Sequence, residues 1–258
     1  FSGLAPEASA GQRYGYQLDD EPRLYPDPAS RSQPDGPHGH SMIIDPSSFD
    51  WNDGNWRGAQ LKGQVLYELH VGTFSPEGTW GGAQLRLPHL ADLGVTAIEM
   101  MPVAECPGTR NWGYDGASLF APFHVYGHPD DLRFFVNEAH AAGLAVVLDV
   151  VYNHLGPDGA YLPAYAPVFF SPAHRSPWGD AVNLDQAGSE MVRAFLIENA
   201  LYWISEFHFD GLRLDATHAM VDESPRHFLA EVADSVHSCG GFRRFVFAED
   251  ERNLAHMV

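Results

Sequence analysis

Cysteine is scarce in this chain, which has only two among 258 residues. Cys106 and Cys239 are far apart in the sequence and lie in no CxxC or metal-ligand spacing. A scaffold held by disulfides normally needs several cysteines at short spacings in an oxidising compartment. We therefore expect two free thiols, a reducing environment and a cytoplasmic location.

Basic residues are also few, with 15 Lys and Arg against 34 Asp and Glu, which gives a formal net charge of -19. They are scattered, whereas a nucleic-acid surface needs a cluster of them, and the net charge repels phosphate backbones and anionic lipids. Long apolar runs are missing too, since none approaches the roughly 20 residues that span a bilayer. We expect neither nucleic acid nor a membrane as a partner.

The apolar content of 45% is enough to bury a large core. Near the start, Tyr14, Tyr16 and Leu18 alternate in the manner of a strand, and a stretch rich in Pro, Asp, Gly and Ser follows at 21–40. This pattern predicts the end of a β-domain plus a linker over residues 1–56. A second domain is expected from residue 57 to residue 258.

Short apolar runs alternate with helical patterns in this second part. Each run is too short for a helix and is rich in Val, Ile, Leu and Phe, so we expect five buried parallel strands. They are Val65–Val71, Val95–Val103, Ala145–Tyr152, Phe209–Leu214 and Phe245–Ala248.

Helices are predicted between these strands. One begins at Pro129, and another covers 189–207 with apolar residues on one side. A further helix is expected to have Ser224 as its N-cap and Pro225 at its first position. The stretch 80–93 also has a helical pattern, which Pro88 should kink or start late.

The fold class is therefore α/β, but its architecture stays open at this point. A (β/α)8 TIM barrel has eight strands, so five would make an incomplete barrel of about five βα units, and an open five-stranded sheet is the alternative. The loop at 155–188 is unusually long and rich in aromatic residues. Long ordered loops of this kind are usually functional.

Polar residues close three of the predicted strands, where parallel α/β folds hold their reacting groups. Alternation places Arg213 and Asp215 on the same side of one strand, and a neighbouring guanidinium favours the ionised carboxylate, as a nucleophile requires. Glu249 closes the next strand, where partial desolvation would favour its acid form. Two carboxylates in opposed environments are what cleavage of a glycosidic bond requires.

Four motifs resemble the signatures of the α-amylase superfamily of glycoside hydrolases, and they occur in the family's order. They are Trp112–Asp115 (WGYD), Asp149–His154 (DVVYNH), Gly211–Asp215 (GLRLD) and Phe247–Asp250 (FAED). The resemblance covers 64–258 and implies an incomplete (β/α)8 barrel, while the first 56 residues resemble the end of the β-sandwich that precedes such barrels.

The resemblance implies a role for each matched residue. Asp215 would be the nucleophile of a retaining reaction, Glu249 the acid/base, and Arg213 would orient Asp215. A third carboxylate, on the seventh strand of the family's barrel, is expected beyond Val258. We therefore expect the 258 residues alone not to hydrolyse efficiently.

Further residues are expected to bind the sugar. By the same resemblance Tyr114 would stack beneath the sugar ring and His154 would hydrogen-bond to it, while Asp149 would brace the network. Trp178, in the long aromatic loop, either stacks on a glucose ring or packs the loop.

Within the superfamily, Tyr67–Trp80 and Ala248–Asn253 are most similar to maltooligosyltrehalose trehalohydrolases. This implies hydrolysis of the α-1,4 bond next to the terminal trehalose unit, with an α-glucan oligosaccharide as substrate. Ordinary α-amylases often have a Lys-His pair where this chain has His218 and Ala219. The alternatives are a branching or debranching enzyme and a non-catalytic glucan-binding module.

No metal or other cofactor is expected. The 14 histidines are scattered and no HExxH motif occurs, which argues against a metal-dependent hydrolase. The acidic residues of the long loop are too dispersed to form a calcium cage, and they are Asp158, Asp180 and Asp185.

Overall fold

A parallel sheet of five strands forms the centre of the protein in a computed structural model, which describes residues 3–242 and 244–252. All five predicted strands are present, although most are shorter than predicted. They are β5 (Leu66–Leu69), β6 (Ala97–Met100), β9 (Ala145–Val150), β12 (Gly211–Leu214) and β13 (Phe245–Ala248).

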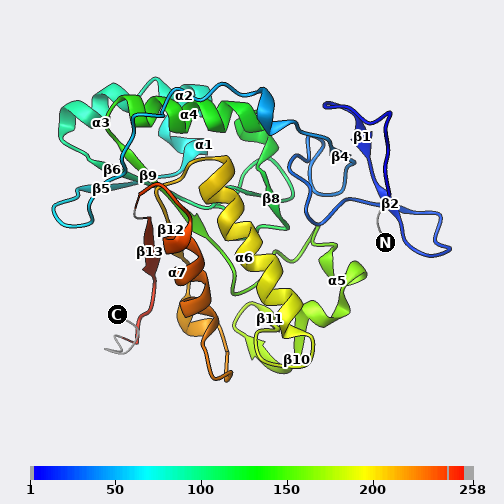
Figure 1. Cartoon of the computed structure of the whole chain (residues 1–258). Coiled ribbons are helices and arrows are strands. Elements are labelled where there is room, and N and C mark those ends of the chain that lie inside the picture. Colours follow the sequence, from blue (N-terminus) through cyan, green and yellow to red (C-terminus); the bar gives the residue numbers. More distant parts are fainter. Residues whose placement is uncertain (1–2, 243, 253–258) are drawn as a thin grey trace.

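The strand order bears on the two architectures that the sequence left open. In space the strands lie in chain order, from β5 through β6, β9 and β12 to β13, and every pairing is parallel. Each crossover therefore moves one strand in the same direction, and right-handed crossovers then put all their helices on one face. A doubly wound open sheet would reverse its order. The sheet is thus wound like part of a TIM barrel, with α4, α6 and α7 following one another around it (Figure 1).

The helices occupy the connections between these strands. Between β5 and β6 lie three short ones, β6 leads to the long helix α4, and the crossovers from β9 and β12 contain α6 and α7. Their bounds are α1 (Val71–Phe74), α2 (Trp80–Gln84), α3 (Leu87–Leu93), α4 (Pro129–Ala141), α6 (Ser189–Glu206) and α7 (Phe228–Ser238).

Helix α4 begins where the sequence predicts and shows why. Pro129 occupies its first turn, and the side chain of His128 accepts a hydrogen bond from the Asp130 amide. Asp131 accepts in return from the His128 amide at 2.7 Å, which completes a capping box. The stretch at 80–93 is two helices, α2 and α3, and Pro88 lies in the first turn of the second.

The predicted start of α7 is wrong by three residues. The helix begins at Phe228, and His227 rather than Ser224 is its N-cap. The Ser224 hydroxyl instead lies within hydrogen-bond distance of Asp222 and of the carbonyl of Arg226. Asp222 also accepts from the amide of Phe228 at 2.6 Å, so this carboxylate, and not the Ser224 hydroxyl, binds the first amide of the helix.

The second predicted strand, 95–103, is shorter in the structure, where β6 ends at Met100. Two strands that the sequence analysis missed follow, β7 (Ala104–Glu105) and β8 (Ser118–Pro122), which pair antiparallel. A short 3-10 helix, η2 (His124–Tyr126), then leads into α4.

The long segment at 155–188 is ordered by secondary structure of its own. It contains the short helix α5 (Leu162–Tyr165), the 3-10 helix η3 (Pro167–Phe169) and an antiparallel hairpin. The strands of this hairpin are β10 (Phe170–Ser176) and β11 (Gly179–Val182).

The first part of the chain packs beside β8 and α5 (Figure 1). Its strands have two residues each and form the pairs β1–β4 and β2–β3, and no sandwich of two sheets is present within residues 3–56. The elements are β1 (Arg13–Tyr14), β2 (Tyr16–Gln17), β3 (Leu24–Tyr25), β4 (Ser41–Met42) and the 3-10 helix η1 (Pro46–Ser48).

Two smaller expectations can be checked directly. Cys106 and Cys239 are both free thiols, as the sequence predicts. Across the residues that the structure describes, no helix has the length and apolar character needed to cross a bilayer.

Candidate active site

The sheet register brings together the strand-end residues of three motifs, Asp149–His154, Gly211–Asp215 and Phe247–Asp250. Asp149 of β9 and Arg213 of β12 are paired in the parallel ladder, so their side chains leave the sheet on the same face. Asp215 and Glu249 directly follow β12 and β13, whose last residues pair with each other. The third and fourth motifs therefore end side by side at the carboxyl edge of the sheet.

Arg213 is the centre of this cluster. Its Nη1 lies 2.5 Å from Oδ2 of Asp149 and 3.0 Å from Oδ1 of Asp215. Its Nη2 lies 3.0 Å from Oε2 of Glu249. One planar guanidinium thus contacts three carboxylates, which a lysine could not do with the same geometry. The predicted proximity of Arg213 and Asp215 is confirmed.

Glu249 is about half exposed. Its side chain is 49% exposed among the described residues, which is compatible with the predicted partial desolvation. The side chain is nevertheless fixed, because Oε2 accepts a hydrogen bond from the Ala216 amide at 2.8 Å. Ala216, immediately after Asp215, has a positive φ of 43°, a conformation that is uncommon for residues other than glycine.

Asn153 is a site residue that the sequence analysis did not single out, although it lies inside the DVVYNH motif. It is buried, and its Nδ2 donates to Oδ2 and to the main-chain carbonyl of Asp215, both at 2.9 Å. Its Oδ1 contacts Nδ1 of His154. Asn153 therefore ties the carboxylate of Asp215 to the imidazole of His154.

Asp149 is a buried carboxyl group with a raised pKa. It is 1% exposed, and burial raises its pKa to about 7, against the opposite effect of Arg213. The nearby charge of Asp215 raises that pKa further. Tyr114 donates to Oδ2 of Asp149 at 3.0 Å, and this contact brings the WGYD loop to the cluster.

His154 and Trp178 come together although 24 positions separate their numbers in the sequence. Their rings are stacked with centroids 5.2 Å apart and planes 18° apart. His154 is buried, which lowers its pKa and favours the neutral imidazole, while the Trp178 side chain is about half exposed. The turn of the β10–β11 hairpin thus places an open indole face beside the cluster.

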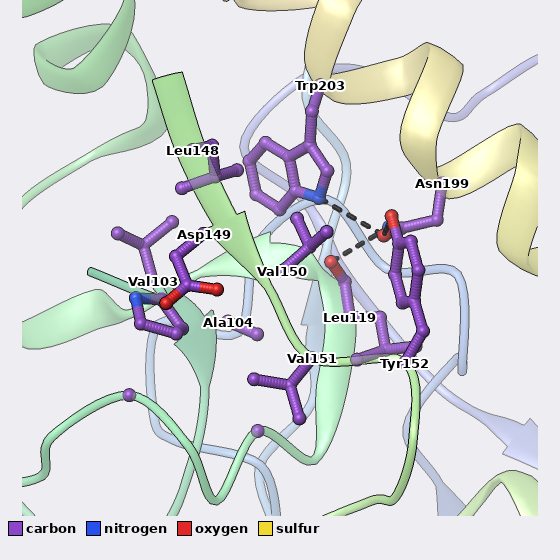
Figure 2. A pocket seen from close by; sticks show the side chains of 13 residues that line it. Val103, Ala104, Leu119, Leu148, Asp149, Val150, Val151, Tyr152, Asn199 and Trp203 are labelled. Carbon is purple, nitrogen blue, oxygen red and sulfur yellow. Dashed lines mark hydrogen bonds between the residues drawn. The ribbon is translucent and has the colours of Figure 1, made fainter. Parts of the chain in front are cut away.

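Behind Asp149 the packing leaves a cavity of only about 20 Å³, lined mainly by apolar side chains of β7, β8, β9 and α6 (Figure 2). A space of this size holds a single water at most and no sugar. Asn199 of α6 closes it, since its Oδ1 accepts from Tyr152 at 2.8 Å and from Trp203 at 3.1 Å. These bonds fix the backbone that leads from β9 to Asn153.

The cluster is built for charge stabilisation and proton transfer by side chains. Within residues 3–242 and 244–252, no group of three or more His, Cys, Asp or Glu side chains has a geometry that could hold a metal ion. The side chain of Asp215, held by Arg213 and Asn153, and the more exposed side chain of Glu249 on the next strand can act as a nucleophile and an acid/base pair.

Known proteins have sequences related to that of this chain. The model of the alpha amylase catalytic domain matches residues 24–165. A malto-oligosyltrehalose trehalohydrolase of Saccharolobus solfataricus is 52% identical over 100% of this chain and 45% of its own length. That of Deinococcus radiodurans is 50% identical over 96% of this chain and 40% of its own.

A solved structure agrees with these sequence matches. The putative alpha amylase from Salmonella typhimurium superposes with a TM-score of 0.91 and 45% identity, over 95% of this chain and 42% of that one. The chain thus spans less than half the length of the relatives it matches. With the parallel sheet, the ordered motifs and the matched domain in agreement, this chain belongs to the alpha-amylase family.

Proposed function

We propose that the protein containing this chain is a retaining glycoside hydrolase that releases trehalose from maltooligosyltrehalose. The bond cleaved is the α-1,4 bond next to the terminal trehalose unit. The observation that carries the proposal is the shared contact of Asp215 and Glu249 with Arg213, at the ends of adjacent strands. The two trehalohydrolase relatives, which cover nearly the whole chain at 50% identity or more, support the choice of substrate.

In the first step Asp215 attacks the anomeric carbon of the sugar and forms a covalent ester, while the bond to the departing oxygen breaks. Glu249 donates its proton to that oxygen, which leaves as a hydroxyl of trehalose. In the second step Glu249 takes a proton from water, and the water oxygen attacks the anomeric carbon. The ester bond then breaks, so Asp215 is again a carboxylate and Glu249 is again an acid.

The other residues hold these two groups and the sugar. Arg213 and Asn153 hold the side chain of Asp215 in position, because both donate to its carboxylate oxygens. Tyr114 and Trp178 offer aromatic faces to the apolar side of a glucose ring, and neutral His154 hydrogen-bonds to its hydroxyls. Asp149 is a brace rather than a catalyst, since it is buried beneath Arg213.

The domain organisation belongs to the same proposal. We place the end of a β-sandwich domain and its linker at 1–56, and the first five βα units of a (β/α)8 barrel at 57–258. A third carboxylate would come from later strands of the barrel. The free thiols of Cys106 and Cys239 support a cytoplasmic location.

The test is incubation of the full-length protein with maltooligosyltrehalose, followed by analysis of the sugars released. Free trehalose is expected, together with the shortened glucan. Release of glucose or maltose without trehalose would contradict the proposal, and transfer or debranching of long glucans would favour a branching or debranching enzyme. Asp215→Asn and Glu249→Gln are expected to lower kcat by at least about 10³-fold while substrate binding persists.

A further inference from the structure

The first part of the chain, residues 3–56, packs closely against the long segment at 155–188. The contact lies around α5, which is beside the first part of the chain in Figure 1. Gly159, shortly before α5, has a positive φ of 82°, and a Cβ at this position would lie 2.7 Å from Cγ of Pro37. The two parts therefore approach too closely here for any side chain larger than that of glycine.

Tyr161, the residue before α5, is the centre of this contact. Its hydroxyl accepts a hydrogen bond from Nη2 of Arg23 at 2.6 Å and lies 2.7 Å from Nδ1 of His38. Nε2 of His38 in turn lies 3.2 Å from Oδ1 of Asp158. The ring of Tyr161 packs edge-on against the rings of Tyr25 and His38, with centroids 5.8 Å apart in each case. One side chain of the long segment thus contacts three side chains of the first part of the chain.

Tyr165, at the other end of α5, makes a second contact of the same kind. Its hydroxyl donates to the carbonyl of Pro26 at 2.9 Å. Its ring lies edge-on against those of Tyr16 and Tyr25, with centroids 6.3 and 6.2 Å away. Aromatic pairs in this geometry stabilise a contact beyond the apolar area that they bury. Both ends of α5 are therefore attached to the first part of the chain.

Helix α5 leads through η3 to the base of the β10–β11 hairpin. Phe169, the last residue of η3, accepts at its carbonyl from the amide of Asn183, directly after β11, at 2.8 Å. The side chain of Asn183 also donates to the carbonyl of Val168 at 3.0 Å. These bonds join the base of the hairpin to η3, so the position of the hairpin follows that of η3 and α5.

The turn of this hairpin carries Trp178 to the candidate active site, where the indole stacks on the ring of His154. His154 is buried and contacts Asn153, whereas the Trp178 side chain is about half exposed. The position of an exposed side chain at a hairpin turn depends on how the base of the hairpin is held.

We propose that Tyr161 is a positioning residue for the candidate active site. By holding α5 against the first part of the chain, it keeps the hairpin where Trp178 stacks on His154. The inference rests on the proposed function, in which these two rings contact the sugar. Tyr161 itself touches no substrate. It acts on substrate binding and leaves the bond cleavage by Asp215 and Glu249 as it is.

The test compares the steady-state kinetics of four full-length proteins on maltooligosyltrehalose, namely the parent, Tyr161→Ala, Trp178→Ala and the double variant. Tyr161→Ala is expected to raise KM roughly fivefold and to change kcat less than about twofold, because it weakens binding that the ground state and the transition state share. Since Tyr161 acts through Trp178, the double variant should have the KM of Trp178→Ala alone.

Two milder variants keep the proposal testable if Tyr161→Ala does not fold. Tyr161→Phe retains the ring without its hydroxyl contacts, and Arg23→Ala removes the donor to that hydroxyl. Each should raise KM about twofold in the parent and have no effect in the Trp178→Ala background. Arg13→Ala is the matched control and should leave KM as it is. Arg13 is also an exposed arginine of the first part of the chain, but its ion pair with Asp35 stays within that part.

Three results would overturn the positioning role. KM values of all the Tyr161 and Arg23 variants equal to that of the parent would show that the contact does not affect the site. Effects of Tyr161→Ala and Trp178→Ala that multiply in the double variant would show that Tyr161 does not act through the hairpin. A loss confined to kcat would contradict a role in binding.

Failure of the proposed function is distinguishable from failure of this inference. The parent protein would then release no trehalose from maltooligosyltrehalose. Calorimetric titration of the same variants with a linear maltooligosaccharide, each variant also carrying Asp215→Asn, would still show whether Tyr161 and Trp178 act together on glucan binding.

Discussion

Nη1 of Arg213 lies 2.5 Å from Oδ2 of Asp149, and the sheet register makes this contact possible because the two residues pair in neighbouring strands. The side chain of Arg213 is 18% exposed, and the side chain of Asp149 that it contacts is 1% exposed. Removing one member of such a pair leaves the other buried without compensation.

The first prediction follows from this contact. Arg213→Gln removes the charge that lies among Asp149, Asp215 and Glu249, so we expect it to lower the free energy of unfolding by about 3–5 kcal/mol. Arg213→Lys keeps the charge but cannot reproduce the forked contacts, and it should recover only part of the stability. Urea unfolding of both variants checks this. Equal stability of the glutamine variant and the parent would be incompatible with it.

The second prediction concerns pH. The pKa of Asp149 is about 7 in the folded protein, well above its ordinary value of 3.8. Between these two values the folded state binds the extra proton, so the contribution of Asp149 to stability is fully present below about pH 4 and is lost as the pH rises through 7. Asp149→Asn removes this titration.

The measurement is urea unfolding at several pH values between 4 and 7 for the parent and Asp149→Asn. The difference in free energy of unfolding between the two is expected to change with pH by up to about 1.4 kcal/mol per unit. A difference that stays constant over this range would show that Asp149 ionises at its ordinary pKa.

The third prediction concerns Asn153, which we propose positions the nucleophile. Asn153→Ala removes the donor to Oδ2 of Asp215, and the released carboxylate should lower kcat by about 10²-fold with a smaller change in KM. The exposed Asn55→Ala is the matched control and should leave both constants as they are. A loss confined to KM would mean that Asn153 acts on substrate binding instead.

The fourth prediction concerns the linker. Asp210 lies just before β12, and its Oδ1 accepts from the Trp56 indole at 2.7 Å. Its Oδ2 accepts from the Val146 amide at 2.8 Å and contacts Nε2 of His140 at 3.0 Å. The Trp56 ring also stacks on His140, with centroids 4.6 Å apart. One buried carboxylate thus fastens the linker to the amino end of the sheet.

Asp210→Ala is expected to lower the free energy of unfolding by at least about 3 kcal/mol, because it leaves buried donors without an acceptor. Asp92→Ala, at an exposed position on α3, should stay within about 0.5 kcal/mol of the parent. Proteolysis should also cut the linker of the first variant faster. If both variants were equally stable, the linker would not depend on this contact.

The sequence by itself determined the parallel strands and the residues at their ends. Apolar runs of β-branched residues and the motifs that close them are local patterns, so the positions of Arg213 and Asp215 could be read without coordinates. Helix α4 was predictable for the same reason, since Pro129 and its acidic first turn are adjacent in the chain.

The tertiary structure decided what depends on contacts between distant residues. The start of α7 moved because Asp222 is held by Arg193 of α6, and no pattern within α7 reveals that ion pair. The role of Asn153 also depends on a distant residue, because its partner Asp215 is 62 residues away. The exposure of the Glu249 side chain likewise depends on how the elements pack. Hydrogen bonds and burial across such separations are set by how elements pack, which local sequence does not encode.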